Sequence, residues 1–167
     1  MSRFTEALIV SPLSDGNTWV VLKSFGYDVG EEGSGDTVEV EKGFVTDFAS
    51  IPRLFWILLP RWGKYGNAAV IHDWLYWSQD RTRADADQIM FEAMDVLSVP
   101  AWQKYLIYGF VRVFGLIPWH RNHWERLEGF ERVLRRSQIK SIEELDRPGI
   151  LSSAWRHYTR RSKESIP

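Results

Sequence analysis

The residues best suited to chemistry lie in the stretch 63–94, which combines one histidine with several carboxylates. His72 and Asp73 are adjacent in the segment AAVIHDWLYW, and Asp87 follows on the next predicted helix. An imidazole exchanges protons near neutral pH, and carboxylates can orient it or ligate a metal. The same groups can also form a polar network inside a small core. The sequence alone leaves both interpretations open.

Two helices joined by a polar turn would hold these side chains. The first is predicted over about 65–77, where His72 and Tyr76 share one face at i, i+4 spacing. On the second helix, Thr82 and Asp85 have the spacing of an N-cap and the acid of a capping box. Asp85 therefore has a structural role, and the other carboxylates remain candidates for chemistry.

Asp87 borders the apolar stripe of the second helix, where an unpaired charge would be costly to bury. His72 on the antiparallel neighbour is one predicted partner. In that arrangement His72 would be the catalytic general base and Asp87 the catalytic carboxylate that orients it. Arg83, four residues before Asp87, is the alternative partner and would make the carboxylate purely structural.

Asp47 and Asp73 are the predicted metal ligands. Asp73 lies about a hundred degrees around the helix from His72, so the two side chains could approach one ion or substrate from different sides. Asp47 lies in the irregular stretch GFVTDFASIPR, where it is either such a ligand or a turn and capping residue. The chain has no cysteine, so the metal would be calcium, magnesium, or zinc held by histidine and carboxylates.

The chain as a whole predicts an α+β fold, in which a small antiparallel N-terminal sheet packs on a mainly helical body. β-branched and aromatic residues predict a strand over 18–29, joined by a Gly-rich loop to a strand over 37–42. Apolar helices are expected over 51–59 and 101–114. The predicted core face of the latter comprises Trp102, Tyr105, Leu106, Phe110, Val113 and Phe114.

Two parts of the chain are expected to differ in role. Residues 1–119 would form the main domain, and residues 120–167 a helical extension with 11 Lys+Arg against 7 Asp+Glu. Gly115 is expected to cap the helix that ends at 114, and Asn122 to begin the next one. His120 and His123 are expected on the surface.

Partners are also constrained by composition. No basic-aromatic ladder typical of nucleic-acid binders is present, so nucleic acid is not an expected partner. No apolar run reaches the roughly 18–20 residues of a transmembrane helix. The aromatic content of 14%, with nine Trp, favours a core of large rings or an aromatic surface that meets a partner.

Three blocks of the sequence resemble a family of uncharacterised phage and prophage proteins. The blocks are GFVTDFASIPR, GKYGNAAVIHDWLY and RADADQIMFEAM, and the likeness extends over about residues 18–115. The resemblance implies a phage or prophage origin. It therefore implies expression in the cytoplasm of a bacterial host, with the virion as a further location, and no particular activity.

A shorter likeness bears on mechanism. The spacing His72-Asp73-x-x-Tyr76, followed by a helix with Asp87, resembles the catalytic helix pair of secreted phospholipases of the A-two class. The resemblance implies that His72 activates water, Asp73 binds calcium and Asp87 orients the histidine. The chain departs from that class because it lacks its Gly-rich calcium loop and its cysteines.

Two functions are expected from these observations. The first is a metal-assisted hydrolase that uses the His-Asp site on lipid or cell-envelope polymer. The second is a non-enzymatic virion, tail or assembly protein in which the His-Asp cluster is a structural polar network. In the second case the aromatic surface would contact other phage structural proteins or a second copy of the chain.

Overall fold

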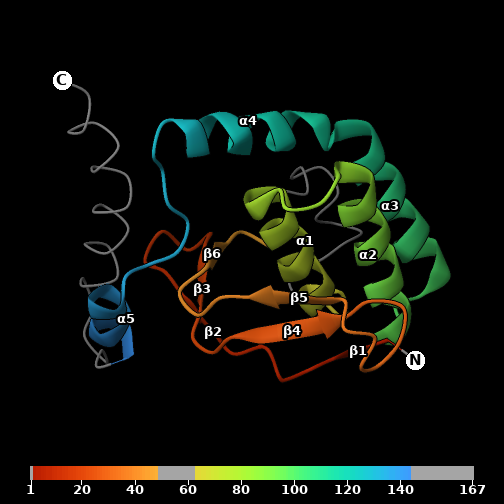
Figure 1. Ribbon diagram of the computed structural model, residues 1–167, viewed down its shortest axis with the longest axis horizontal. Helices are drawn as coiled ribbons and strands as arrows, with labels where there is room; N and C mark the ends of the chain where they lie inside the picture. Colours follow the sequence, from red (N-terminus) through yellow and green to blue (C-terminus); the bar gives the residue numbers. More distant parts are fainter. Residues whose placement is uncertain (1, 49–62, 144–167) are drawn as a thin grey trace.

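The computed structural model of the chain describes residues 2–48 and 63–143, with the strands first and the helices after them (Figure 1). The strands in these ranges are β1 (Arg3–Phe4), β2 (Val10–Pro12), β3 (Trp19–Val21), β4 (Phe25–Asp28), β5 (Thr37–Val40) and β6 (Val45–Thr46). The helices are α1 (Gly66–Ser78), α2 (Arg83–Val96), α3 (Ala101–Phe114), α4 (Leu116–Leu127) and α5 (Arg136–Glu143). The helix predicted over 51–59 and the end of the predicted extension lie outside the described residues.

The described strands form two antiparallel sheets of three strands each, in the orders β1-β4-β5 and β2-β3-β6. The predicted α+β fold is confirmed. The single strand predicted over 18–29 is wrong, because the chain bends at 22–24 and separates β3 from β4. β3 pairs with β2 and β6, whereas β4 pairs with β1 and β5. The β-propensity of this segment therefore predicted strands correctly, but it did not predict that the strand is divided in two. The hairpin of β4 and β5 has the register Phe25↔Val40.

Helix α1 lies at the centre of the molecule. It packs against β5, β6, α2 and α4, so that it lies between the sheets and these two helices (Figure 1). Nine of its thirteen residues are buried, including the small residues Ala68 and Ala69. This enclosure explains why its sequence is mostly apolar, and it places His72 inside the fold rather than on its surface.

Helix α2 begins with the predicted capping box. The Thr82 hydroxyl accepts a hydrogen bond from the Asp85 backbone N–H at 3.2 Å, and Asp85 Oδ2 accepts one from the Thr82 backbone N–H at 3.3 Å. These bonds satisfy two backbone donors that a helix start otherwise leaves unpaired. The cap therefore sets where α2 begins, and with it the position of Asp87 one turn later.

The predicted core face of α3 is mostly wrong, although Leu106 is partly buried against the core. The residues that α3 buries are Lys104, Ile107 and Val111. Four of the predicted core residues are instead exposed: Trp102, Tyr105, Val113 and Phe114. Both sides of this helix carry apolar residues, so periodicity could not decide which side meets α2. The aliphatic stem of Lys104 is accommodated because its ammonium pairs with Asp95 and lies over the Phe91 ring.

The chain continues from α3 to α4 through a single residue. Gly115 is the C-cap residue of α3, as predicted, and it has right-handed helical angles (φ −63°, ψ −15°). Asn122 lies inside α4 and is buried, so its predicted role as an N-cap is wrong. None of the helices within 2–48 and 63–143 is long and apolar enough to cross a bilayer.

After α4 the chain returns to the sheets. Val133 forms an isolated antiparallel bridge with Phe44, and the Val45 N–H donates to the Arg132 carbonyl at 2.8 Å. The expected boundary between 119 and 120 falls within α4. The division of the chain into a domain over 1–119 and an extension over 120–167 stays a prediction.

Replacing Thr82 with alanine should lower the free energy of unfolding by about 1 kcal/mol, because the N-terminal donors of α2 lose their cap. Thr82→Ser retains the hydroxyl and should unfold close to wild type. Urea titration followed by circular dichroism measures both. Equal stability of the alanine variant and wild type would show that the capping box does not hold this helix end.

Candidate functional site

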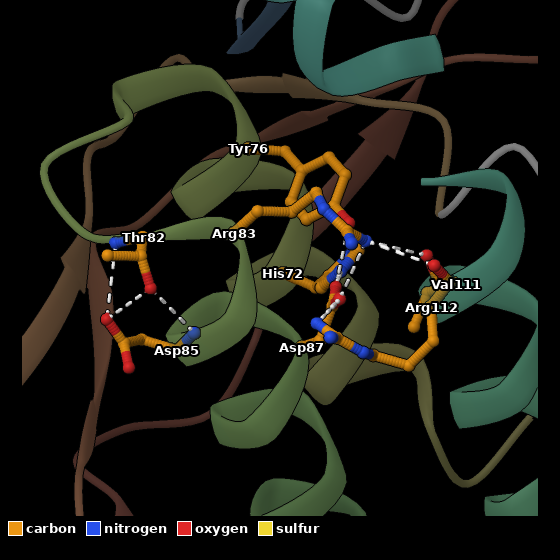
Figure 2. A network of polar contacts seen from close by, with 8 residues as sticks. All are labelled: His72, Tyr76, Thr82, Arg83, Asp85, Asp87, Val111 and Arg112. Carbon is orange, nitrogen blue, oxygen red and sulfur yellow. Dashed lines mark hydrogen bonds and ion pairs between the residues drawn. The ribbon is translucent and has the colours of Figure 1, made fainter. Parts of the chain in front are cut away.

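The buried carboxylate of Asp87 is the centre of a network that joins three helices (Figure 2). Helix α1 contributes His72 and Tyr76, α2 contributes Arg83 and Asp87 itself, and α3 contributes Arg112. The predicted pairing of His72 with Asp87 is present in the structure. The alternative pairing with Arg83 is present as well, because the two partners bind different oxygens of the same carboxylate.

Each carboxylate oxygen of Asp87 receives two donors. Oδ1 accepts from His72 Nε2 at 2.9 Å and from the Tyr76 hydroxyl at 2.7 Å. Oδ2 accepts from Arg83 Nη1 at 3.1 Å and from Arg112 Nη1 at 3.0 Å. Asp87 is 0% exposed and His72 is 4% exposed, so these contacts replace water as the partners of the charge.

The network keeps Asp87 ionised. Burial alone would raise the pKa of this carboxyl, but the hydrogen bonds from His72 and Tyr76, together with that from Arg112, outweigh it and hold the pKa below its ordinary value. Burial, and then the bond to Asp87, raise the pKa of the Tyr76 phenol. At neutral pH the phenol is therefore a protonated donor facing an ionised acceptor.

An ionised carboxylate decides which ring nitrogen of His72 carries a proton. The carboxylate can only accept, so Nε2 bears the hydrogen in the 2.9 Å contact. In the neutral ring, Nδ1 then holds the free lone pair, and no hydrogen bond to Nδ1 occurs among the described residues. Contact with the Tyr76 ring, at a centroid distance of 4.0 Å, restricts rotation of the imidazole. The arrangement can hold a base in one orientation.

The corner between α3 and α4 reaches this network because residue 115 is a glycine. A Cβ at Gly115 would lie 2.3 Å from the Tyr76 hydroxyl and 2.3 Å from the Val111 carbonyl oxygen. Arg83 also donates to the Val111 and Arg112 carbonyls, both at 3.3 Å. The side chain that neutralises Asp87 thus also binds the C-terminal end of α3, where helix carbonyls attract a cation.

A second polar cluster lies where β6 meets α1. The Thr46 hydroxyl donates to Asp73 Oδ2 and accepts from the Phe48 backbone N–H at 3.0 Å. Phe48 is buried with φ of +58°, a conformation that is costly for a bulky residue. Asp47, between these two residues, is half-buried. The cluster fixes the loop that follows β6 against the helix that carries His72.

The predicted catalytic residues contact each other, and the predicted metal ligands are not bonded to them. His72 and Asp87 are bonded to each other, whereas no hydrogen bond or ion pair in the described part of the chain joins either of them to Asp47 or Asp73. Asp47 and Asp73 each take part in other interactions. No group of three or more His, Asp or Glu side chains within 2–48 and 63–143 is arranged to hold a metal. The metal site stays a prediction.

The sequence did not predict that Arg112 and Gly115 belong to the Asp87 network. It placed Tyr76 on the same helix face as His72 but did not predict its hydrogen bond to Asp87. Arg112 did carry a signal, because it is the one charged residue in the apolar run 105–119. A lone charge in such a run requires a buried partner or an exit to water. His120 and His123 are exposed, as expected.

The fold and the site define an α+β protein whose helices are joined by a buried His–Asp–Arg network. The chain belongs to the family described as "Protein of unknown function (DUF1353)", which matches residues 19–111. The predicted likeness to an uncharacterised family is thereby confirmed, and its phage origin stays a prediction. The matched range contains both helices that carry His72 and Asp87. No curated protein and no solved structure matches the chain.

Gly115→Ala should lower the free energy of unfolding by about 1–3 kcal/mol, because the added methyl group forces the Tyr76 hydroxyl away from Asp87. Gly109→Ala is the matched control on α3, since nothing lies within 4 Å of a Cβ at that position. The control should be unchanged, or stabilised by up to about 1 kcal/mol through helix propensity. Thermal and urea unfolding of the pair test this, and equal effects at both positions would contradict it.

The stability of the protein should fall in acid partly because of Asp87. Its folded-state pKa lies below the ordinary value of 3.8, so the unfolded chain takes up this proton first as the pH falls. The stability that the Asp87 charge contributes is fully present above the ordinary pKa of 3.8, and it is lost as the pH falls through the lower pKa of the folded state.

Asp87→Asn should therefore show a shallower loss of stability in acid than wild type. At neutral pH it should already be less stable by about 3 kcal/mol or more, because two arginines lose their buried counter-charge. Urea unfolding over a pH series measures both effects. Parallel pH curves for the two proteins would exclude Asp87 as an acid-sensitive group.

Proposed function

We propose that the protein is a hydrolase in which His72 is the general base. The observation that carries the proposal is the buried 2.9 Å hydrogen bond from His72 Nε2 to Asp87 Oδ1. Because Asp87 stays ionised, Nδ1 is the nitrogen left to accept a proton. Asp87 is a positioning residue in this scheme, since it acts through the imidazole and not on the substrate.

The proposed reaction is the hydrolysis of an acyl bond in a lipid or a cell-envelope polymer. Nδ1 of His72 accepts a proton from water while the water oxygen attacks the carbonyl carbon. The tetrahedral intermediate then collapses, the bond to the leaving oxygen or nitrogen breaks, and the proton passes from the imidazole to the leaving group. The ion pairs of Asp87 with two arginines keep the carboxylate charged throughout this cycle.

A divalent metal, calcium or zinc, would be held by Asp47 and Asp73. The hydrogen bond between Thr46 and Asp73 supports this assignment, because it ties the loop that carries Asp47 to α1. Calcium suits this neighbourhood better than zinc, since calcium also takes backbone carbonyl oxygens and needs no cluster of nitrogen ligands. When bound, the ion would polarise the substrate carbonyl.

The origin proposed for the protein is a phage or prophage. The proposal rests on the three sequence blocks that resemble such proteins, two of which contain Asp47, His72 and Asp73. The protein would be made in the cytoplasm of the bacterial host and could act from there or from the virion. A phage would use acyl hydrolysis to breach the cell envelope during infection or lysis.

A second candidate function is that of a non-enzymatic virion, tail or assembly protein. It is favoured by the closure of the network, since four side-chain donors satisfy a carboxylate that is 0% exposed. In this case the network holds α1, α2 and α3 together and performs no chemistry. Other phage structural proteins, or a second copy of the chain, would then be the partners.

His72→Gln should lower the hydrolysis rate by a factor of about 100 or more, because it removes the general base. The assay follows fatty-acid release from phospholipid vesicles and amine release from purified peptidoglycan, with calcium or zinc present. His123→Gln is the matched control, since it removes an exposed histidine from α4 and should retain wild-type rates. Urea unfolding of each variant separates loss of chemistry from loss of fold.

Calorimetry tests the metal separately. Wild type should bind calcium, and Asp73→Asn should bind it more weakly while remaining folded. The hydrolase proposal fails if wild type cleaves neither substrate and gives no heat with calcium or zinc. A folded His72→Gln variant that retains wild-type rates would also overturn it, whereas reduced stability with no activity in any form favours the structural function.

A further inference from the structure

Helix α4 turns its apolar side away from the protein. Its exposed large hydrophobic residues are Leu116, Ile117, Trp124 and Leu127, with Ile117 the most exposed at 73%. At about 100° per residue these four positions fall within one arc of roughly 100° on the helix surface. Eight of the ten exposed large hydrophobic residues in the described part of the chain lie on α3 and α4. This concentration sets the two helices apart from the rest of the surface.

The side of α4 that faces the protein packs one ring, Trp119, on Tyr76 and is otherwise held by polar contacts. Asn122 is buried and its Nδ2 donates to the Tyr76 carbonyl at 3.0 Å. Gln79 Nε2 donates to the Trp119 carbonyl at 2.8 Å. An amphipathic helix of a globular protein normally does the reverse and packs its apolar stripe inward. The described part of the chain therefore leaves the outward stripe of α4 uncovered.

The exposed stripe continues from α4 back along α3 with a fixed interval. Its positions form two series eleven residues apart: Trp102, Val113 and Trp124, and Tyr105, Leu116 and Leu127. The chain turns at Gly115, so α3 and α4 run in different directions and these residues do not form one flat face (Figure 1). We name the exposed hydrophobic residues of the two helices the α3–α4 stripe.

The part of the chain that bears this stripe is basic. Residues 101–127, which include the stripe, contain 4 Lys+Arg against 1 Asp+Glu, whereas residues 1–100 contain 8 against 15. On α4 the exposed side chains beside the stripe include His120, Arg121 and His123, while Glu125 is half-buried in ion pairs with Arg121 and Arg132. A partner that complements this surface is apolar and anionic.

We propose that the α4 part of the stripe lies in the headgroup region of an anionic phospholipid bilayer. Trp124 and Ile117 would enter the boundary between headgroups and acyl chains, where tryptophan is favoured. Arg121 would meet the anionic headgroups. Because α3 and α4 run in different directions, a flat bilayer contacts α4 and the corner rather than both helices along their length (Figure 1).

A second copy of the chain fits this surface less well. A two-fold pair brings the same patch against itself, so the arginines of α4, Arg121 and Arg126, would gather at one interface. An anionic bilayer instead attracts them. The membrane contact is also independent of the proposed hydrolase, because none of its residues belongs to the Asp87 network.

Flotation with lipid vesicles tests the proposal on the full chain. The protein should float with vesicles of phosphatidylcholine and phosphatidylglycerol, and less with phosphatidylcholine alone. Raising the salt from about 0.1 M to about 1 M should weaken the binding, because salt screens the attraction. The double variant Ile117→Gln, Trp124→Gln should bind at least about tenfold more weakly. Ile9→Gln, an exposed hydrophobic on the sheet side at 47%, should bind like wild type.

Several results would overturn the proposal. They are failure of wild type to float with anionic vesicles, unchanged binding of the double variant, and loss of binding in the Ile9→Gln control. A wild-type dimer in light scattering that the double variant dissociates, without vesicle binding, would assign the stripe to a second copy instead. His72→Gln should float like wild type, so failure of the membrane contact and failure of the hydrolase are distinguishable.

Discussion

The arrangement of the helices depends on one buried charge, the carboxylate of Asp87. Removing a carboxylate from water is costly unless charged and polar donors replace the lost hydration. Here the donors come from three helices, with His72 and Tyr76 on α1, Arg83 on α2 and Arg112 on α3. Their convergence specifies how the helices lie relative to one another, because any displacement leaves a charge unpaired inside the protein. Apolar contacts supply the bulk of the packing but are less directional.

The same constraint shapes the chemistry available to the site. A carboxylate kept ionised by two arginines holds the Nε2 proton of His72 and leaves the basic lone pair on Nδ1. Rigidity and reactivity therefore arise from one set of bonds. Asp73 lies on a different side of α1 from His72 and is hydrogen-bonded to Thr46. An ion held by Asp73 would therefore lie beside the His72 imidazole and would not involve Asp87.

Much of the helix pair could be predicted because its determinants are local. The i, i+4 relation of His72 and Tyr76 and the capping box of Thr82 depend only on helix geometry and nearby backbone donors. The inverted face of α3 could not be predicted, since both sides of that helix are apolar and only contact with α2 chooses between them. Gly115 was correctly expected to cap α3, but the reason for a glycine there could not be predicted. A side chain at position 115 would collide with the hydroxyl of Tyr76, a residue far away in the sequence.

The sequence by itself determined the α+β class, the helix that carries His72 and Asp73, and the start of the helix that carries Asp87. Each follows from periodicity, propensity or capping over a few neighbouring residues. Only the tertiary structure decided that Arg112 joins Arg83 on one carboxylate, and that the apolar stripe of α3 and α4 faces outward. Both outcomes depend on which surfaces of the folded chain meet, because the residues that bury a charge or a ring are far from it in the sequence.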